Sequence, residues 1–171
     1  MAACAVCGFD DESTTEDRAR RELLDGVAEI ALSVATAPSD AVGRRPAPEV
    51  WSPLQYACHV RDVLLAQRER AVQALVEDDP SFTPMYRDRR AELARYGDER
   101  PEVVAAHVRV AAHLFVWLFD GLDETARARP CVYNYPERKG RTVGWLLVHS
   151  AHEVVHHAGD VRRALGATGA A

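Results

Sequence analysis

The chain has 171 residues, of which 47% are hydrophobic and 27% charged, and its formal net charge is −5. This length suits one domain with a single core, and the balance of apolar and charged residues excludes a disordered chain. The acidic charge argues against nucleic-acid binding, because neutralising phosphates needs a concentrated Lys/Arg face. No continuous apolar stretch approaches the roughly 20 residues that span a bilayer, and the N-terminus lacks the basic region of a signal peptide. We therefore expect a cytoplasmic protein without a membrane or nucleic-acid partner.

Four amphipathic helices are predicted along the chain. Each shows apolar residues at the spacing of one helical face, between recognisable start and stop signals. Ser13 and Glu16 have the spacing of a capping box, and Ser52 followed by Pro53 gives a stronger start to the second helix. The predicted helices cover residues 13–37, 52–77, 101–121 and 142–166.

The connections between these helices are long. Residues 38–50 are rich in proline and glycine, residues 80–100 hold one short helix near 87–96, and residues 121–141 hold a short extended piece near 132–135. We find no internal repeat, no β-alternation of useful length and no second domain. The sequence therefore predicts an all-α four-helix bundle with long crossover connections over residues 13–166. Residues 1–12 form an N-terminal segment with a CxxC pair, and residues 167–171 form a loose tail.

The fourth helix is rich in histidine and offers two pairs of metal ligands at i,i+4 spacing. One pair is His152 with His156, and the other is Glu153 with His157. A helical wheel separates them, because the apolar residues of this helix share one direction. His157 lies inside the apolar arc and Glu153 at its edge, whereas His152 and His156 point the opposite way and are expected on the surface. The apolar residues that define the arc are Leu146, Leu147, Val154, Val161 and Leu165.

A glutamate and a histidine that face the core need partners, because an unpaired buried carboxylate costs several kcal/mol. Glu153 and His157 could share a metal ion. Alternatively, Glu153 could form a structural ion pair with an arginine while His157 is a satisfied core histidine. His149 lies on the flank near Glu153 and is predicted to contact the ligands without binding the metal itself.

A metal site needs a third protein ligand, with positions left open if the site is catalytic. His59, early in the second helix, can supply that ligand, and His107 and His113 on the third helix compete with it. The second helix is apolar around most of its circumference, so periodicity does not choose between them. Asp62, one turn after His59, is predicted to orient the His59 imidazole by accepting a hydrogen bond.

Several of these features resemble the DinB-like superfamily of metal-binding four-helix bundles, over roughly residues 15–165. In that family one histidine of the second helix joins an i,i+4 pair of the last helix, so the resemblance implies His59, Glu153 and His157 as the metal ligands. The commonest last-helix pair is two histidines. Glutamate at the first position is similar to the mycothiol-dependent maleylpyruvate isomerase branch. The features that carry the resemblance are Trp51-Ser-Pro, His59 with Asp62, the long crossover, and Glu153-x-x-x-His157-Ala-Gly-Asp160.

The resemblance implies thiol chemistry on a divalent metal. Zinc is favoured because the family usually binds zinc or nickel, and iron stays open because two histidines and one carboxylate also form the site of non-haem iron enzymes. The expected partners are a low-molecular-weight thiol such as mycothiol and an electrophilic substrate, and a homodimer is one expected assembly. Coordination would deprotonate the thiol, and the thiolate would attack the electrophile, as in an S-transferase or isomerase. Two alternatives stay open: a non-catalytic metal-binding or redox and stress-response protein, and a bundle with a buried polar network.

The N-terminal segment carries Cys4-Ala-Val-Cys7-Gly8, which looks like half of a zinc knuckle. A complete structural zinc site needs four ligands, and the chain has no second CxxC, so the other ligands would have to come from elsewhere. A redox-active pair, a disulfide and no special role are the alternatives for Cys4 and Cys7. Cys58 is expected as a small core residue.

Overall fold

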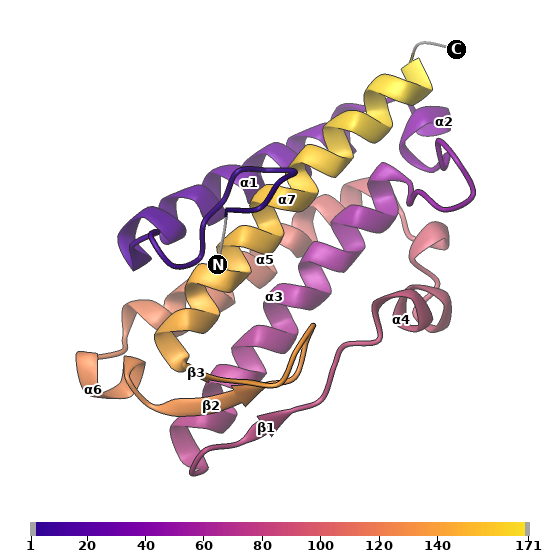
Figure 1. Cartoon of the computed structure of the whole chain (residues 1–171). Coiled ribbons are helices and arrows are strands. Elements are labelled where there is room, and N and C mark those ends of the chain that lie inside the picture. Colours follow the sequence, from indigo (N-terminus) through magenta and orange to yellow (C-terminus); the bar gives the residue numbers. More distant parts are fainter. Residues whose placement is uncertain (1–2, 170–171) are drawn as a thin grey trace.

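The computed structural model describes residues 3–169, and its main feature is a bundle of four long helices (Figure 1). Both α1 and α3 pack against both α5 and α7, so the four helices surround a common core. The predicted all-α four-helix bundle with long crossover connections is confirmed. The bounds of the four helices are α1 (Glu16–Thr36), α3 (Pro53–Val76), α5 (Pro101–Asp120) and α7 (Val143–Gly169).

Local capping signals set most of the helix ends. The hydroxyl of Ser52 accepts the Gln55 backbone N–H at 3.2 Å, and the Gln55 side chain accepts the Ser52 N–H at 3.1 Å, which confirms the predicted capping box. The hydroxyl of Thr142 accepts the Trp145 N–H at 3.2 Å and caps α7 as predicted. These short-range hydrogen bonds fix where the two helices that carry the candidate ligands begin.

Two helix ends differ from the prediction. The N-cap of α1 is Thr15, whose hydroxyl accepts the Arg18 N–H at 3.3 Å, while the Ser13 hydroxyl donates to Asp10 at 2.7 Å instead of capping a helix. At the other end α7 continues to Gly169, so residues 167–169 are helical and not a loose tail. Residues 1, 2, 170 and 171 lie outside the described residues.

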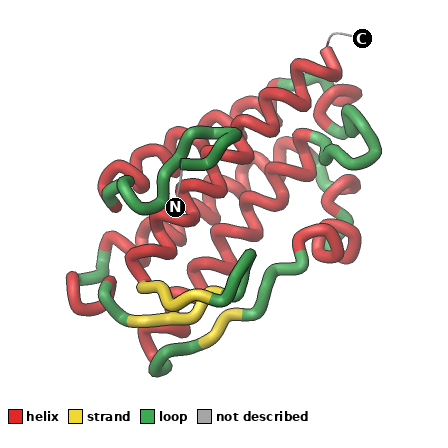
Figure 2. Tube along the Cα trace, in the orientation of Figure 1, coloured by secondary structure: helices red, strands yellow, loops and turns green. Residues whose placement is uncertain are grey.

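A small sheet that the sequence did not predict joins the two long crossovers, residues 80–100 and 121–141 (Figure 2). β1 (Ser81–Phe82) pairs in parallel with β2 (Pro130–Tyr133), which pairs antiparallel with β3 (Lys139–Thr142). The predicted extended piece is β2, and the strands are too short to show a period of two. Short helices complete the connections: α2 (Ser39–Val42), α4 (Arg87–Leu93), the 3₁₀ helix η1 (Tyr96–Asp98) and α6 (Glu124–Arg127).

Contrary to the expectation from the sequence, α5 is long and apolar enough to cross a membrane by length and composition, with a mean hydropathy of 1.5. It nevertheless has the packing of a core helix. Val104, Val108 and Phe115 are fully buried against the rest of the bundle, while Trp117 is exposed on the opposite face. One face of α5 therefore belongs to the core of the bundle, although only 44% of the apolar window is buried.

Candidate metal centre

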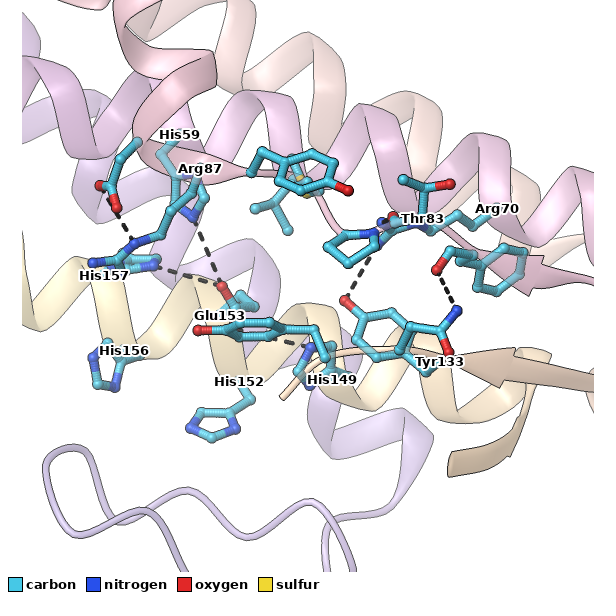
Figure 3. A pocket seen from close by; sticks show the side chains of 18 of the residues that line it. His59, Arg70, Thr83, Arg87, Tyr133, His149, His152, Glu153, His156 and His157 are labelled. Atoms are coloured by element: carbon cyan, nitrogen blue, oxygen red, sulfur yellow. Dashed lines mark hydrogen bonds and ion pairs between the residues drawn. The ribbon is translucent and has the colours of Figure 1, made fainter. Parts of the chain in front are cut away.

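His59 of α3 and Glu153 and His157 of α7 point toward one another between the two helices (Figure 3). One carboxylate oxygen of Glu153 lies 3.9 Å from His59 Nε2 and 3.6 Å from His157 Nε2. These distances are too long for hydrogen bonds. They are close to the spacing of about 3.3 Å between two ligand atoms that each lie ~2.0–2.1 Å from a tetrahedral zinc ion. The structure thus brings the three predicted ligands together, and the donor set suits a divalent transition metal.

The site opens onto a pocket of about 720 Å³ between α7, α3 and the two crossovers. The imidazoles of His59 and His157 are only 5% and 6% exposed, whereas the Glu153 side chain is 32% exposed because it faces this pocket. His59, Glu153 and His157 all border this pocket, so a small molecule in it can reach the cluster. The remaining walls carry aromatic, apolar and basic residues that include Phe82, Met85, Arg87, Tyr133 and Tyr135.

Asp160 orients the His157 ring through the Nδ1 atom of that ring. Its carboxylate lies 2.8 Å from His157 Nδ1 and also accepts a hydrogen bond from Arg163 at 2.7 Å. With Nδ1 engaged, the Nε2 atom of His157 faces Glu153. Burial lowers the pKa of His157, but the hydrogen bond to Asp160 and the nearby Glu153 carboxylate outweigh burial and raise it. Sequence reasoning gave Asp160 no role, although its i+3 spacing from His157 was a usable signal.

The His59 imidazole is enclosed by aromatic rings. Its ring packs edge-on against Trp51, with centroids 5.2 Å apart, and against His157, with centroids 4.9 Å apart. Burial lowers the pKa of His59, which favours the neutral imidazole that metals bind. Its Nδ1 atom is buried and has no hydrogen-bond partner among the described residues.

The prediction that Asp62 orients His59 is wrong. The Asp62 carboxylate accepts a hydrogen bond from the Tyr96 hydroxyl at 2.6 Å and another from Arg61 Nε at 2.8 Å. The guanidinium of the adjacent Arg61 on α3 and the phenol of Tyr96 in η1 therefore occupy the carboxylate. The helical spacing of Asp62 and His59 indicates neither partner. Asp62 therefore anchors η1 to α3 and does not support the candidate ligand.

Glu153 has histidines, and no arginine, as its ion-pair partners within residues 3–169. The alternative of a structural pair between Glu153 and an arginine is therefore wrong. Burial raises the pKa of Glu153, but the imidazoles of His157 and His59 that face its carboxylate outweigh burial and place the pKa well below its usual range. His149, predicted to support the ligands, lies with Nε2 at 3.9 Å from the second carboxylate oxygen and stacks on Trp145.

The other two histidines of α7 are not surface residues, contrary to the prediction. The side chains of His152 and His156 are 22% and 29% exposed, because Cys4 and Phe9 of the N-terminal segment contact them. Figure 1 shows this segment lying along α7. Cys4 Sγ lies 3.6 Å from His156 Nδ1, and the Phe9 ring stacks on His152 at 5.2 Å between centroids. One ligand atom from each of Cys4, Cys7, His152 and His156 lies within 4.8 Å of the others. The CxxC pair thus meets the outward-facing pair of α7.

The remaining candidates lie away from both clusters. His107 and His113 are exposed on α5 and reach neither group of donor atoms, so His59 is the histidine that lies with the candidate ligands of α7. Cys58 is fully buried in the core, as predicted, and burial raises its pKa. Cys4 differs, because the backbone N–H of Cys7 lowers its pKa to about 5. All four cysteines are free thiols.

Comparison with known proteins supports the same fold. The chain is similar to the solved structure of YfiT from Bacillus subtilis, described as a "probable metal-dependent hydrolase with an unusual four-helix bundle topology". The TM-score is 0.72 at 18% sequence identity, and the match covers 88% of this chain and 87% of YfiT. A comparison with curated proteins gives no significant match. Residues 17–161, most of the chain, match the DinB superfamily. The chain therefore belongs to the DinB superfamily.

Proposed function

We propose that the protein is a metal-dependent enzyme that uses a low-molecular-weight thiol of the mycothiol type, as an S-transferase or isomerase, with zinc as the metal. One observation carries the proposal: His59, Glu153 and His157 converge in the wall of a pocket that leaves one side of the cluster open. Three protein ligands with an accessible fourth position are typical of catalytic zinc sites, whereas structural sites are closed by four protein ligands.

A divalent metal bound by these residues would supply Lewis acidity, which converts an incoming thiol into a thiolate at neutral pH. The chain's own residues set the direction of approach. His59 and His157 are buried on the bundle side, so they exclude water there, and Glu153 is exposed toward the pocket. The thiol and its electrophile must therefore enter along the face that carries Glu153. The ionised Glu153 carboxylate also contributes one negative charge, which favours the binding of a divalent cation at this site.

The pocket walls fit an anionic organic substrate. Arg87 lies over the Trp51 ring at 5.3 Å, and Arg70 lies over the Tyr133 ring at 5.2 Å while donating to its hydroxyl at 3.2 Å. Guanidinium groups bind carboxylates through paired hydrogen bonds, and the aromatic walls can pack the carbon skeleton. We propose that Arg87, which is exposed at the pocket, binds a carboxylate of the thiol or of the electrophile.

A hydrolase is the second candidate. The observation that favours it is the shared fold with YfiT, which is described as a probable metal-dependent hydrolase. The same three donors with an open side serve metal-dependent hydrolysis in other folds, with water in place of the thiol. The two candidates therefore differ in the nucleophile and share the site.

A thiol-addition assay tests the first candidate. Protein loaded with zinc should accelerate the addition of mycothiol to monochlorobimane, and chelation should abolish the acceleration until zinc is restored. His157→Ala should remove the activity and the zinc held by this cluster, because it deletes one of three ligands, whereas His113→Ala on exposed α5 should change neither.

Equal rates with the zinc-loaded and metal-free forms would refute the thiol-dependent function. Zinc-dependent hydrolysis of p-nitrophenyl esters in that case would favour the hydrolase. No zinc-dependent reaction of either kind would leave a metal-binding bundle without catalysis.

A further inference from the structure

We propose that Cys4, Cys7, His152 and His156 form a second zinc site, structural in character and separate from the cluster of His59, Glu153 and His157. One ligand atom from each of the four residues lies within 4.8 Å of the others. Two thiolates and two imidazoles make a complete tetrahedral set, and closed four-ligand sites of this composition hold structural zinc. The proposal goes beyond the proposed function and does not depend on it.

The turn of residues 4–9 presents the two cysteines as a knuckle. The Gly8 N–H donates to the Cys4 carbonyl at 2.8 Å, and the Cys4 N–H donates to the Phe9 carbonyl at 2.7 Å. Gly8 has a φ of +74°, a conformation that residues with a side chain rarely adopt. The closed turn keeps both sulfur atoms within reach of the same pair of histidines.

A carboxylate lies beside each of the two imidazoles as an ion-pair neighbour. His152 Nδ1 lies 2.8 Å from Asp11, and His156 Nε2 lies 3.7 Å from Asp160. The nitrogen left over on each ring is the one available to a cation, and His156 Nδ1 indeed lies 3.6 Å from Cys4 Sγ. Histidines that bind metals usually have a carboxylate beside their other ring nitrogen, and Asp11 and Asp160 occupy that position for His152 and His156.

The position of this second cluster gives it a structural consequence for the pocket. His152 and His156 point away from His59, on the side of α7 that the N-terminal segment covers (Figure 3). Cys4, His152 and His156 also contribute to the lining of the pocket that holds Glu153. An ion bound by the four residues would therefore fasten the N-terminal segment to α7 and fix this wall of the pocket. Phe9, only 3% exposed and stacked on His152, already anchors the segment beside the cluster.

Metal stoichiometry of the full chain tests the proposal. Protein purified under reducing conditions and loaded with zinc should hold two equivalents, measured by inductively coupled plasma mass spectrometry. The double variant Cys4→Ser, Cys7→Ser should lose the zinc of the second site and keep that of the cluster with His59. His59→Ala should lose the zinc of its own cluster and keep that of the second site. Cobalt-substituted protein should show thiolate-to-cobalt charge-transfer bands that the cysteine variant loses and the His59→Ala variant keeps.

His156→Ala supplies an independent variant that leaves both cysteines in place. It should also lose the equivalent that carries the charge-transfer bands, while His113→Ala, an exposed histidine on α5, should lose none. Retention of both equivalents by the cysteine variant would overturn the proposal, as would cobalt-loaded wild type without thiolate bands. A Cys4–Cys7 disulfide in the zinc-loaded protein would overturn it equally, because a disulfide offers no thiolate ligand.

Discussion

Asp160 is the residue that ties the two histidine clusters of α7 together. Its carboxylate is hydrogen-bonded to His157 Nδ1 at 2.8 Å and lies 3.7 Å from His156 Nε2, so it is a neighbour of one imidazole of each cluster. Arg163 donates to the same carboxylate and limits its rotation. Carboxylates in this position raise the basicity of the ligand and keep its metal-binding nitrogen in the correct direction.

The substitution Asp160→Asn should weaken zinc binding by His157 roughly 10- to 100-fold, because the amide keeps the volume but loses the charge that polarises the ring. Competition against a chromophoric chelator measures the affinity. The Cys4→Ser, Cys7→Ser background should be used, so that the cluster containing His156 does not contribute. Asp25→Asn, an exposed position on α1, is the matched control. Equal affinities for the two asparagine variants would show that Asp160 does not act through His157.

Glu153 and His157 lie on the side of α7 that faces His59, where the helical wheel places them. The wheel separated Glu153 and His157 from His152 and His156 because the apolar face of α7 follows the helical period. The same wheel could not show that the opposite face is covered, since no local pattern encodes where the N-terminal segment folds. The prediction for Asp62 was wrong for a related reason, because its partner Tyr96 belongs to a crossover outside the helix that carries Asp62.

At the scale of elements, α1 and α7 approach so closely that the contact needs a glycine. A Cβ on Gly26 would lie 2.8 Å from Cγ1 of Val154, which is fully buried. Val154 directly follows Glu153, so this contact also fixes the height of α7 at the candidate site. Valine is stiff about its first side-chain torsion, so the methyl group cannot move away at low cost.

Gly26→Ala should lower the free energy of unfolding by about 1 kcal/mol, because overpacking costs ~1–3 kcal/mol and the gain in helix propensity returns only ~1 kcal/mol. Gly166→Ala, also inside a helix, is the control, since its Cβ would meet nothing within 4 Å. That control should gain ~0.5–1 kcal/mol. Urea unfolding followed by circular dichroism measures both changes. A stabilised Gly26→Ala protein would mean that α1 and α7 are more loosely packed than described.

The elements themselves divide into those with local signals and those without. The long helices were predictable because their starts are marked by Ser52, Pro101 and Thr142, and their faces by apolar periodicity. The sheet was not, because β1 and β2 hold two and four residues and pair across two different crossovers. Pairing between such short, distant segments follows from the packing of the whole chain.

At the scale of the whole molecule, the candidate ligands join helices that are distant in sequence. His59 belongs to α3, whereas Glu153 and His157 belong to α7, and the two helices pack side by side. Their donor atoms meet only in the folded chain, so a cation that binds all three must favour the folded state. The same reasoning applies to the N-terminal cysteines and the outer histidines of α7.

Removal of metal should therefore lower the thermal stability of the protein. Zinc at 100 times its Kd adds about 2.7 kcal/mol to the free energy of unfolding, which corresponds to a rise in Tm of roughly 5–10 °C for a chain of this size. Differential scanning calorimetry with zinc and with excess chelator measures the difference. His157→Ala should lose the share of the rise that the inner cluster provides, whereas His113→Ala should keep all of it. The rise should shrink as the pH falls, and the loss should begin above the ordinary imidazole pKa of about 6.5, because the pKa of His157 is raised and protonated imidazoles do not bind zinc. A Tm that is the same with zinc and with chelator would contradict metal binding at both clusters.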